Sequence, residues 1–267
     1  MSFGRSRTCL PFLTPETSES EPVGTRRVGS LRSAAALLLV IGAAFCCTAS
    51  AQTAHFSGAV KMLGGGFSIP EGVAANGSGN VFVADNGNSE VKEMPAGCTS
   101  SACVTTLGGG FKEPIGVAVD GSGNVFVGDY GNNAVKEIPA GCASSACVTT
   151  LGGGFSYPEG VAVDGSGNVY VADAGNDAVK EIPAGCTSSA CVTTLGGGFS
   201  YPKGVAVDGN GNVFVADSGD NDAVKEIPAG CTSSTCVTTL GGGFGTPLAW
   251  RWTATETSSS PICLTVR

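Results

Sequence analysis

The stretch that decides the fold is Pro158 to Leu195, which reads PEGVAVDGSGNVYVADAGNDAVKEIPAGCTSSACVTTL. Four copies of it follow one another along the chain with few changes. Leu-Gly-Gly-Gly-Phe blocks begin at residues 63, 107, 151, 195 and 240, so their spacings are 44, 44, 44 and 45 residues. A fixed period of this length indicates a chain built from repeated structural units.

Within one copy, short runs of β-branched and aromatic residues alternate with turn residues. In the third copy, residues 160–164 and 169–173 flank Asp-Gly-Ser-Gly-Asn and predict a hairpin. A third strand is expected at 178–182, because Pro183 cannot donate to a ladder, and a fourth at 191–195. In the second copy the strands are expected near 116–120, 124–129, 134–138 and 147–151.

Four antiparallel strands per period predict an all-β fold, a β-propeller of four-stranded blades. The phenylalanines of the Leu-Gly-Gly-Gly-Phe blocks are expected to pack between blades. The expected organisation is a signal peptide at 1–51, a partial repeat giving an outer strand at 52–62, blades at 63–106, 107–150, 151–194 and 195–239, the start of a fifth blade at 240–247, and a frameshifted tail at 248–267.

Residues 158–176, Pro-Glu-Gly-Val-Ala-Val-Asp-Gly-Ser-Gly-Asn-Val-Tyr-Val-Ala-Asp-Ala-Gly-Asn, resemble the NHL repeat. The resemblance recurs four times between Leu63 and Leu240 and implies a propeller of NHL type. Because such propellers usually close with more than four blades, the resemblance implies that four complete repeats form an incomplete ring, whose open edges favour self-association. The chain departs from the family where the family often has His or Arg before the third strand. Those positions hold Glu90, Ala134, Ala178 and Ala223.

Residues 1–51 differ from the repeats. Five arginines precede an apolar run at 34–45, and Ala-Ser-Ala at 49–51 has the form of a cleavage site. This pattern predicts a secretory signal peptide and a secreted or periplasmic protein without a membrane span after cleavage. A retained N-terminal anchor is the alternative, although the apolar run is short for a bilayer span.

The charge of the chain argues against nucleic acid as a partner. The formal net charge is −8, and removal of residues 1–51 takes away five Arg and three Glu, which makes it about −10. No basic patch with interleaved aromatic residues is present, so a solvated acidic surface is the simpler interpretation.

Eight of the twelve cysteines form four pairs with the same spacing. Each pair flanks a four-residue turn before the fourth strand, where cross-strand Cβ atoms approach disulfide distance. An exported chain meets oxidising conditions, which favours bridges. Zinc is the alternative, although histidine is nearly absent. The expected disulfides are Cys98–Cys103, Cys142–Cys147, Cys186–Cys191 and Cys231–Cys236.

Asp120, Asp164 and Asp208 open the Asp-Gly-x-Gly-Asn turns. A calcium loop uses oxygens at such spacing, but an aspartate that caps its own turn amides explains the pattern more simply. Asn76 takes the place of Asp in the first copy, which a required calcium ligand would not readily tolerate. We therefore expect turn caps, with no metal and no cofactor.

One face of the propeller is a candidate binding surface, because two sets of loops meet there. The loops between the second and third strands and those between blades carry carboxylates, amides and phenols, with Glu71 and Glu159 among them. The alternative is that the aspartates are turn caps in every blade, since the four copies look alike and break the repeat symmetry little. The candidate ligand-binding residues are Asp85, Asp129, Asp173, Asp217, Asn88, Asn132, Asn176, Tyr157 and Tyr201.

These observations favour a secreted, non-catalytic propeller that binds a protein or a glycan. The alternative is an enzyme, because some propeller lyases resemble this repeat and use histidines, often with a metal. This chain has a single histidine, His55, outside the repeats, and no Ser-His-Asp set can be assembled. No catalytic residue is therefore expected.

The tail at 248–267 lacks the alternation and turns of the repeat. One permitted choice of codons for 248–262, read two bases further on, encodes Gly-Val-Ala-Val-Asp-Gly-Asn-Gly-Asn-Val-Phe-Val-Ala-Asp, which is identical to residues 204–217. Tryptophan has a single codon, which restricts the choice at Trp250 and Trp252. We therefore expect that loss of one base beside Pro247 shifted the frame and that the tail, with Cys263, carries no function.

Overall fold

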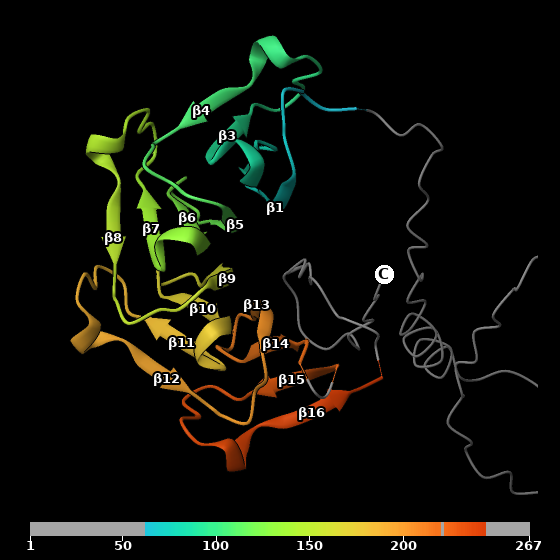
Figure 1. Ribbon diagram of the computed structural model, residues 1–267, viewed down its shortest axis with the longest axis vertical. Coiled ribbons are helices and arrows are strands. Elements are labelled where there is room, and N and C mark those ends of the chain that lie inside the picture. The colour runs from blue at the N-terminus through green and yellow to red at the C-terminus, as the bar shows by residue number, and fades with distance from the viewer. Residues whose placement is uncertain (1–61, 220–221, 244–267) are drawn as a thin grey trace, which may run out of the picture. The chain divides into compact units, whose positions relative to one another are not determined.

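The computed structural model describes residues 62–219 and 222–243, and all structural statements below concern these residues. They form four antiparallel sheets, each of four consecutive strands (Figure 1). The strands are β1 (Pro70–Ala75), β2 (Val81–Asp85), β3 (Glu90–Met94) and β4 (Thr105–Leu107) in blade 1; β5 (Pro114–Val119), β6 (Val125–Asp129), β7 (Ala134–Ile138) and β8 (Thr149–Leu151) in blade 2; β9 (Pro158–Val163), β10 (Val169–Asp173), β11 (Ala178–Ile182) and β12 (Thr193–Leu195) in blade 3; and β13 (Pro202–Val207), β14 (Val213–Asp217), β15 (Ala223–Ile227) and β16 (Thr238–Gly241) in blade 4.

The predicted all-β architecture with four four-stranded blades is confirmed. In blade 2, β7 has the expected bounds, and β5 and β6 begin or end within two residues of them. The fourth strand was expected to begin at Cys147 but begins at Thr149, because residues 145–147 form a 3-10 turn, η4 (Ser145–Cys147). The cysteine therefore belongs to the turn and not to the ladder.

The hairpin between the first two strands of a blade is fixed by an aspartate that caps its own turn. In blade 3, Asp164 Oδ1 accepts from the Ser166 and Asn168 N–H groups at 2.8 and 2.9 Å, and Oδ2 accepts from Asn168 Nδ2 at 2.9 Å. Gly167 has a φ of 85°, which glycine adopts without steric cost. Asp120 and Asp208 make the same contacts.

The core lies between adjacent blades. One cluster joins Phe82, Ala84 and Val91 of blade 1 to Val117 and Val127 of blade 2, and equivalent clusters join blades 2 to 3 and 3 to 4. The block phenylalanines Phe111, Phe155 and Phe199 are buried in these clusters, as expected from the sequence. Phe67 was expected to do the same, but it is only partly buried and packs within blade 1, because no described blade precedes it. Full burial of a side chain of this kind contributes about 1.5–3 kcal/mol, so the interfaces between blades hold the fold.

The innermost strands approach one another so closely that glycine is required between them. A Cβ built on Gly116 would lie 2.2 Å from the Glu159 carbonyl oxygen, and one on Gly160 would lie 2.5 Å from that of Lys203. Both obstacles are backbone atoms, which cannot rotate away. The Pro-x-Gly sequence at the start of each blade therefore sets the spacing of the row.

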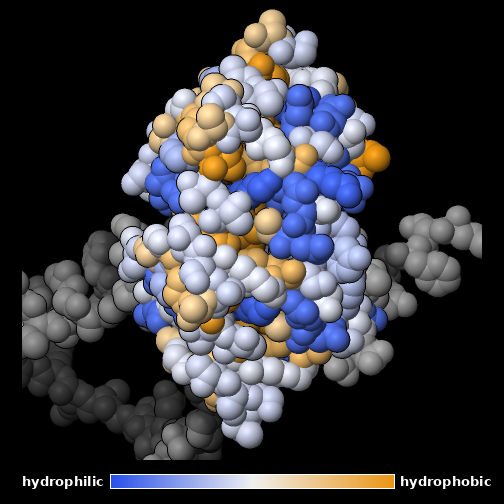
Figure 2. All heavy atoms as spheres, turned by 60° about the vertical axis from the view of Figure 1, so that its left-hand side comes forward, coloured by the Kyte–Doolittle hydropathy of each residue, from blue (hydrophilic) through white to orange (hydrophobic). Residues whose placement is uncertain are grey.

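Blade 1 lacks the cover that the other blades receive from the blade before them. Val73 is 65% exposed, whereas its counterparts Val117, Val161 and Val205 are 7–8% exposed. On the face that Figure 2 shows, with the side bearing β8 turned forward, hydrophobic groups are separated by hydrophilic ones.

The cysteine pairs lie at disulfide distance with the pairing expected from the sequence, and their Cα atoms are 5.8–6.1 Å apart. In the part of the chain that the structure describes, no helix is long and apolar enough to cross a membrane. The signal peptide, the segment 52–61 and the tail at 248–267 lie outside the described residues.

Candidate functional site

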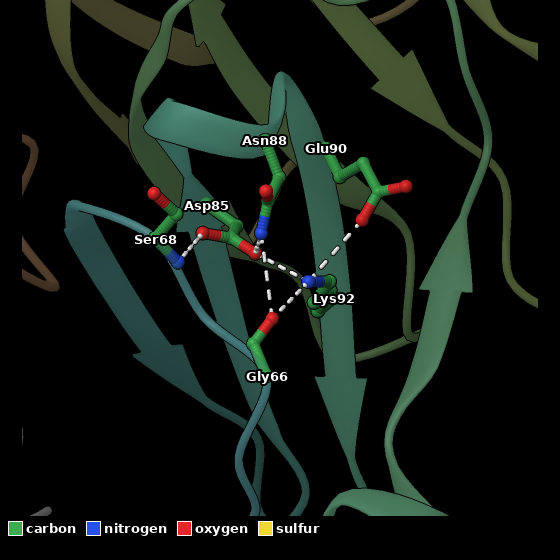
Figure 3. Close-up of polar contacts among 6 residues, drawn as sticks. All are labelled: Gly66, Ser68, Asp85, Asn88, Glu90 and Lys92. Atoms are coloured by element: carbon green, nitrogen blue, oxygen red, sulfur yellow. Dashed lines mark hydrogen bonds and ion pairs between the residues drawn. The ribbon is translucent and has the colours of Figure 1, made fainter.

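The aspartate that ends each second strand is the centre of a buried polar network. In blade 1, Asp85 accepts from the Ser68 N–H at 2.6 Å and from Asn88 Nδ2 at 2.8 Å, and it pairs with the Lys92 ammonium (Figure 3). Lys92 Nζ also donates to the Gly66 carbonyl at 2.7 Å. The network joins the second strand, the third strand and the loop that enters the blade.

The same network recurs in the other three blades. The Asp129–Lys136, Asp173–Lys180 and Asp217–Lys225 pairs have N–O distances of 2.6, 2.6 and 2.5 Å. In every blade the aspartate is fully buried, and the lysine ammonium lies 5.3–5.4 Å from the centre of the block phenylalanine ring. We call each set an aspartate–lysine lock.

In each lock, the aspartate that was predicted to bind a ligand joins parts of its own blade. Burial acts to raise the pKa of the Asp85 carboxyl, but hydrogen bonds from Lys92, Asn88 and the Ser68 N–H, together with the Lys92 charge, hold the pKa below its usual value of 3.8. Asn132 and Asn176 donate to the lock carboxylates of their own blades at 2.8 and 2.7 Å. Ligand binding by these aspartates and asparagines stays a prediction, and their geometry favours the turn-and-lock alternative.

Sequence reasoning missed the lysines, which are half of each lock. The signal was present, because Val-Lys-Glu follows the turn after the second strand in every copy; the turn begins Asp-x-Gly-Asn in three copies and Asp-Ser-Gly-Asp in the fourth. A lysine repeated at one position of a strand whose neighbour ends in aspartate predicts an ion pair, since opposite charges on adjacent strands attract.

Tyr157 and Tyr201 lie on an exposed face, as the sequence suggested. They precede β9 and β13 and are 47% and 37% exposed. Their φ angles are 50° and 51°, in a backbone region that residues other than glycine seldom adopt. Hydrogen bonds to the preceding blade hold this backbone conformation: the Tyr157 N–H donates to Asn133 Oδ1 at 2.8 Å, and the Tyr201 N–H donates to Asp177 Oδ1 at 2.7 Å.

A third tyrosine and a buried glutamate complete this part of the face. The rings of Tyr130 and Tyr157 have centroids 5.0 Å apart, and Tyr201 interacts through its hydroxyl with Tyr130 and with Glu159. Glu159, the second residue of β9, is 9% exposed. Burial raises the pKa of its carboxyl, Lys203 and Tyr201 act to lower it, and Glu71 acts to raise it. The structure thus gathers residues from blades 2, 3 and 4 around one carboxylate.

The four copies differ most on this same face. When they are aligned, only four repeat positions carry three or more residue types, and every other position within the four described copies carries one or two. Backbone bonds such as Gly131 N to Lys112 O, at 2.9 Å, and Gly175 N to Ser156 O, at 2.9 Å, hold the two sets of loops that carry these positions together. We call the set the variable face: Ile69, Glu113, Tyr157 and Tyr201; Glu71, Ile115, Glu159 and Lys203; Asn86, Tyr130, Ala174 and Ser218; and Ser89, Asn133, Asp177 and Asp222.

A family model described as "NHL repeat" matches residues 67–93, 111–138, 155–181 and 199–221. The chain is an NHL-repeat protein. The first three matches reach into the third strand of their blades, the fourth ends before β15, and the resemblance expected from the sequence is confirmed.

Solved structures share the architecture of this NHL chain at low sequence identity. A streptogramin B lyase is 12% identical with a TM-score of 0.50, over 67% of this chain and 56% of that one. The hydrazine synthase of Kuenenia stuttgartiensis is 16% identical with a TM-score of 0.54, over 70% of this chain and 53% of that one. The NHL chain spans about half the length of these proteins, and the likeness shows the fold alone. A comparison with curated proteins finds no match.

The variable face offers phenol, amide, hydroxyl and carboxylate groups at its surface. Within the described residues, no group of three or more His, Cys, Asp or Glu side chains is placed to hold a metal ion. Phenol rings, amides and carboxylates at the ends of rigid strands provide apolar contact and hydrogen bonds together. Such an arrangement is suited to recognition.

Proposed function

We propose that this NHL chain is a non-catalytic binding module whose variable face recognises a protein or a glycan. The observation that carries the proposal is the concentration of differences between the copies on one face. A scaffold that is constant elsewhere holds differing side chains at the ends of its loops, which is how rigid folds present binding residues.

The composition of the variable face supports recognition. Tyrosine supplies large, rigid and amphipathic contact area, while serine and asparagine supply adaptable hydrogen bonds. The locks tie the loops that carry this face to the second and third strands of each blade. The face is therefore preorganised, which lowers the entropic cost of binding.

We further propose that the module acts outside the cytoplasm. The four cysteine pairs at disulfide distance are compatible with an oxidising compartment. Peptide mass spectrometry of non-reduced exported protein should find each pair linked within one peptide. Free thiols at most of these positions would contradict the proposal.

The internal copies supply variants that the fold already tolerates. Tyr157→Glu together with Glu159→Ile gives blade 3 the residues that blade 2 has at these positions, Glu113 and Ile115. We expect this face swap to lower the affinity by about tenfold or more for any ligand found on a glycan array or by capture from a defined protein panel. The matched control is Asn210→Ser, which gives blade 4 the residue that the other blades carry in the opposite hairpin turn.

The comparison of the two variants decides the outcome. Binding that survives the face swap unchanged would refute the proposed function, as would an equal loss in the Asn210→Ser control. Stoichiometric metal in the purified protein, accompanied by turnover of a substrate, would favour the enzyme alternative.

A further inference from the structure

Tyr130, Tyr157, Tyr201 and Glu159 form a group without an equivalent in the other described parts of the chain. The counterparts of Tyr130 in the other blades are Asn, Ala and Ser, and the counterparts of Glu159 are Glu, Ile and Lys. We call this group the tyrosine–glutamate cluster. It breaks the repeat symmetry at a single place, as a specific site requires.

The geometry of the cluster places aromatic rings around one acidic group. Tyr130 comes from the loop after β6, whereas Tyr157 and Tyr201 precede β9 and β13. The planes of Tyr130 and Tyr157 are tilted by 33°. Glu159 is nine-tenths buried beside them, and its carboxylate interacts with the Tyr201 hydroxyl.

The charges that face Glu159 are few. Lys203 is the cation that acts on its carboxylate, and Glu71 adds a second negative charge. Burial raises the pKa of the Glu159 carboxyl, although Lys203 acts to lower it. Among the described residues, the ion pairs within 4 Å join other side chains and do not include Glu159, so Lys203 is not in direct contact with this carboxylate.

The protein already places a cation of its own at the cluster. Lys203 Nζ lies 5.6 Å from the centre of the Tyr201 ring, within the range of a cation–π contact. An alkylammonium group is thus accommodated by this combination of ring and carboxylate. Lys203 is on β13 and only partly buried, so an incoming cation competes with it for the same partners.

Resting on the proposed function, we propose that the tyrosine–glutamate cluster binds the side chain of a lysine or arginine of a protein partner. The tyrosine rings contact the cation through their faces, and Glu159 provides the opposite charge. A charge-assisted bond to a buried carboxylate is about twice as strong as a neutral one, so a basic side chain gains more here than a neutral sugar hydroxyl does.

The probes are an acetylated tri-arginine amide and its tri-citrulline counterpart, which has the same shape without the charge. Binding to the purified full chain is measured by isothermal titration at low ionic strength, since salt screens the attraction. We expect the arginine peptide to bind about tenfold more tightly than the citrulline peptide, equivalent to about 1.4 kcal/mol. Equal affinity for the two peptides would overturn the proposal.

Three variants locate the contact. Glu159→Gln is expected to weaken arginine binding about tenfold, and Glu159→Lys, which repeats the residue of blade 4, to abolish it. Lys203→Met removes the competing cation and is expected to strengthen binding several-fold. An unchanged or weaker affinity in Lys203→Met would contradict the proposal, because the ligand cation would then not share the partners of Lys203.

Glu137→Gln is the matched control. It removes one negative charge from β7, where burial and Asp120 raise the pKa of the Glu137 carboxyl, away from the tyrosines. An equal loss in Glu137→Gln and Glu159→Gln would show attraction by net charge alone and overturn the site. Urea midpoints of all variants verify folding.

Different results would refute the cation site and the proposed function. A glycan or neutral ligand that is lost in the face swap, combined with no preference for arginine over citrulline, would refute the cation site and leave the binding module intact.

Discussion

Removal of one aspartate from a lock should destabilise the whole row of blades. Asp173 is the sharpest choice, because it lies in blade 3 between two other blades and is fully buried. It accepts from the Ser156 N–H at 2.7 Å and from Asn176 at 2.7 Å, and it pairs with Lys180 at 2.6 Å. We predict that Asp173→Ala lowers the free energy of unfolding by about 3–5 kcal/mol, the usual cost of breaking a buried ion pair from one side.

The magnitude follows from the groups left behind. The Ser156 N–H loses its acceptor, and an unsatisfied buried donor costs about 1–3 kcal/mol. Lys180 keeps the Gly154 carbonyl at 2.6 Å and the Phe155 ring, but its ammonium loses the only carboxylate that the structure pairs with it. The Lys180→Met change should cost less than Asp173→Ala, because two hydrogen bonds remain on the carboxylate.

Urea unfolding followed by circular dichroism measures both single variants and the double variant. Asp173 and Lys180 contact each other, so we expect the double variant to be more stable than the sum of the two losses predicts, by about 1.5 kcal/mol or more. A cost below about 1 kcal/mol for Asp173→Ala, or strict additivity of the two changes, would refute the lock as a stabilising unit.

Three further predictions follow from the fold. The pKa of the Asp85 carboxyl is lower in the folded state than its usual value of 3.8. The contribution of this carboxylate to the free energy of unfolding should therefore be complete above about pH 4 and lost as the pH falls through the lower folded-state pKa. A urea midpoint that does not fall between about pH 5 and pH 2 would contradict this. Gly160→Ala should lower the free energy of unfolding by about 1–3 kcal/mol, because the new Cβ would lie 2.5 Å from the Lys203 carbonyl oxygen. Gly165→Ala should cause no such loss, because its Cβ would meet nothing within 4 Å. Equal urea midpoints for the two variants would exclude the close approach. Replacement of Cys186 and Cys191 by alanine should cost about 2 kcal/mol, because the bridge closes a short loop, and no change in the melting curve of non-reduced protein would count against the bridge.

Much of the fold could be predicted from the sequence because its determinants are local and repeated. Asp164 and Gly167 fix a turn between two β-branched runs, and Pro183 ends the third strand, so each strand has a nearby cause. The start of the fourth strand could not be placed in this way. Cys147 has the spacing of a strand residue, but the 3-10 turn of η4 takes it out of the ladder, and nothing in the local pattern distinguishes the two.

The candidate site was harder to predict. The aspartates at 85, 129, 173 and 217 were candidates because their loops meet on one face, and their likeness in every copy favoured a structural role. The partner in that role, the lysine of the next strand, was not recognised from the sequence. The tyrosine–glutamate cluster needs contacts between blades, which no single copy contains.

The four copies within this chain separate what folding requires from what it leaves open. A side chain that every blade needs, such as the lock aspartate or the inner-strand glycine, is the same in each copy, because any change carries a similar energetic cost in each. Positions that vary among Ile, Glu and Tyr, or among Glu, Ile and Lys, are free of that demand, and in this chain such positions gather on one face. Folding alone does not require the free positions to lie together, since the opposite hairpin turns and the outer strands are equally exposed and stay nearly constant. The clustering of variable positions on one face is therefore not explained by folding, and we propose recognition by the variable face as its explanation.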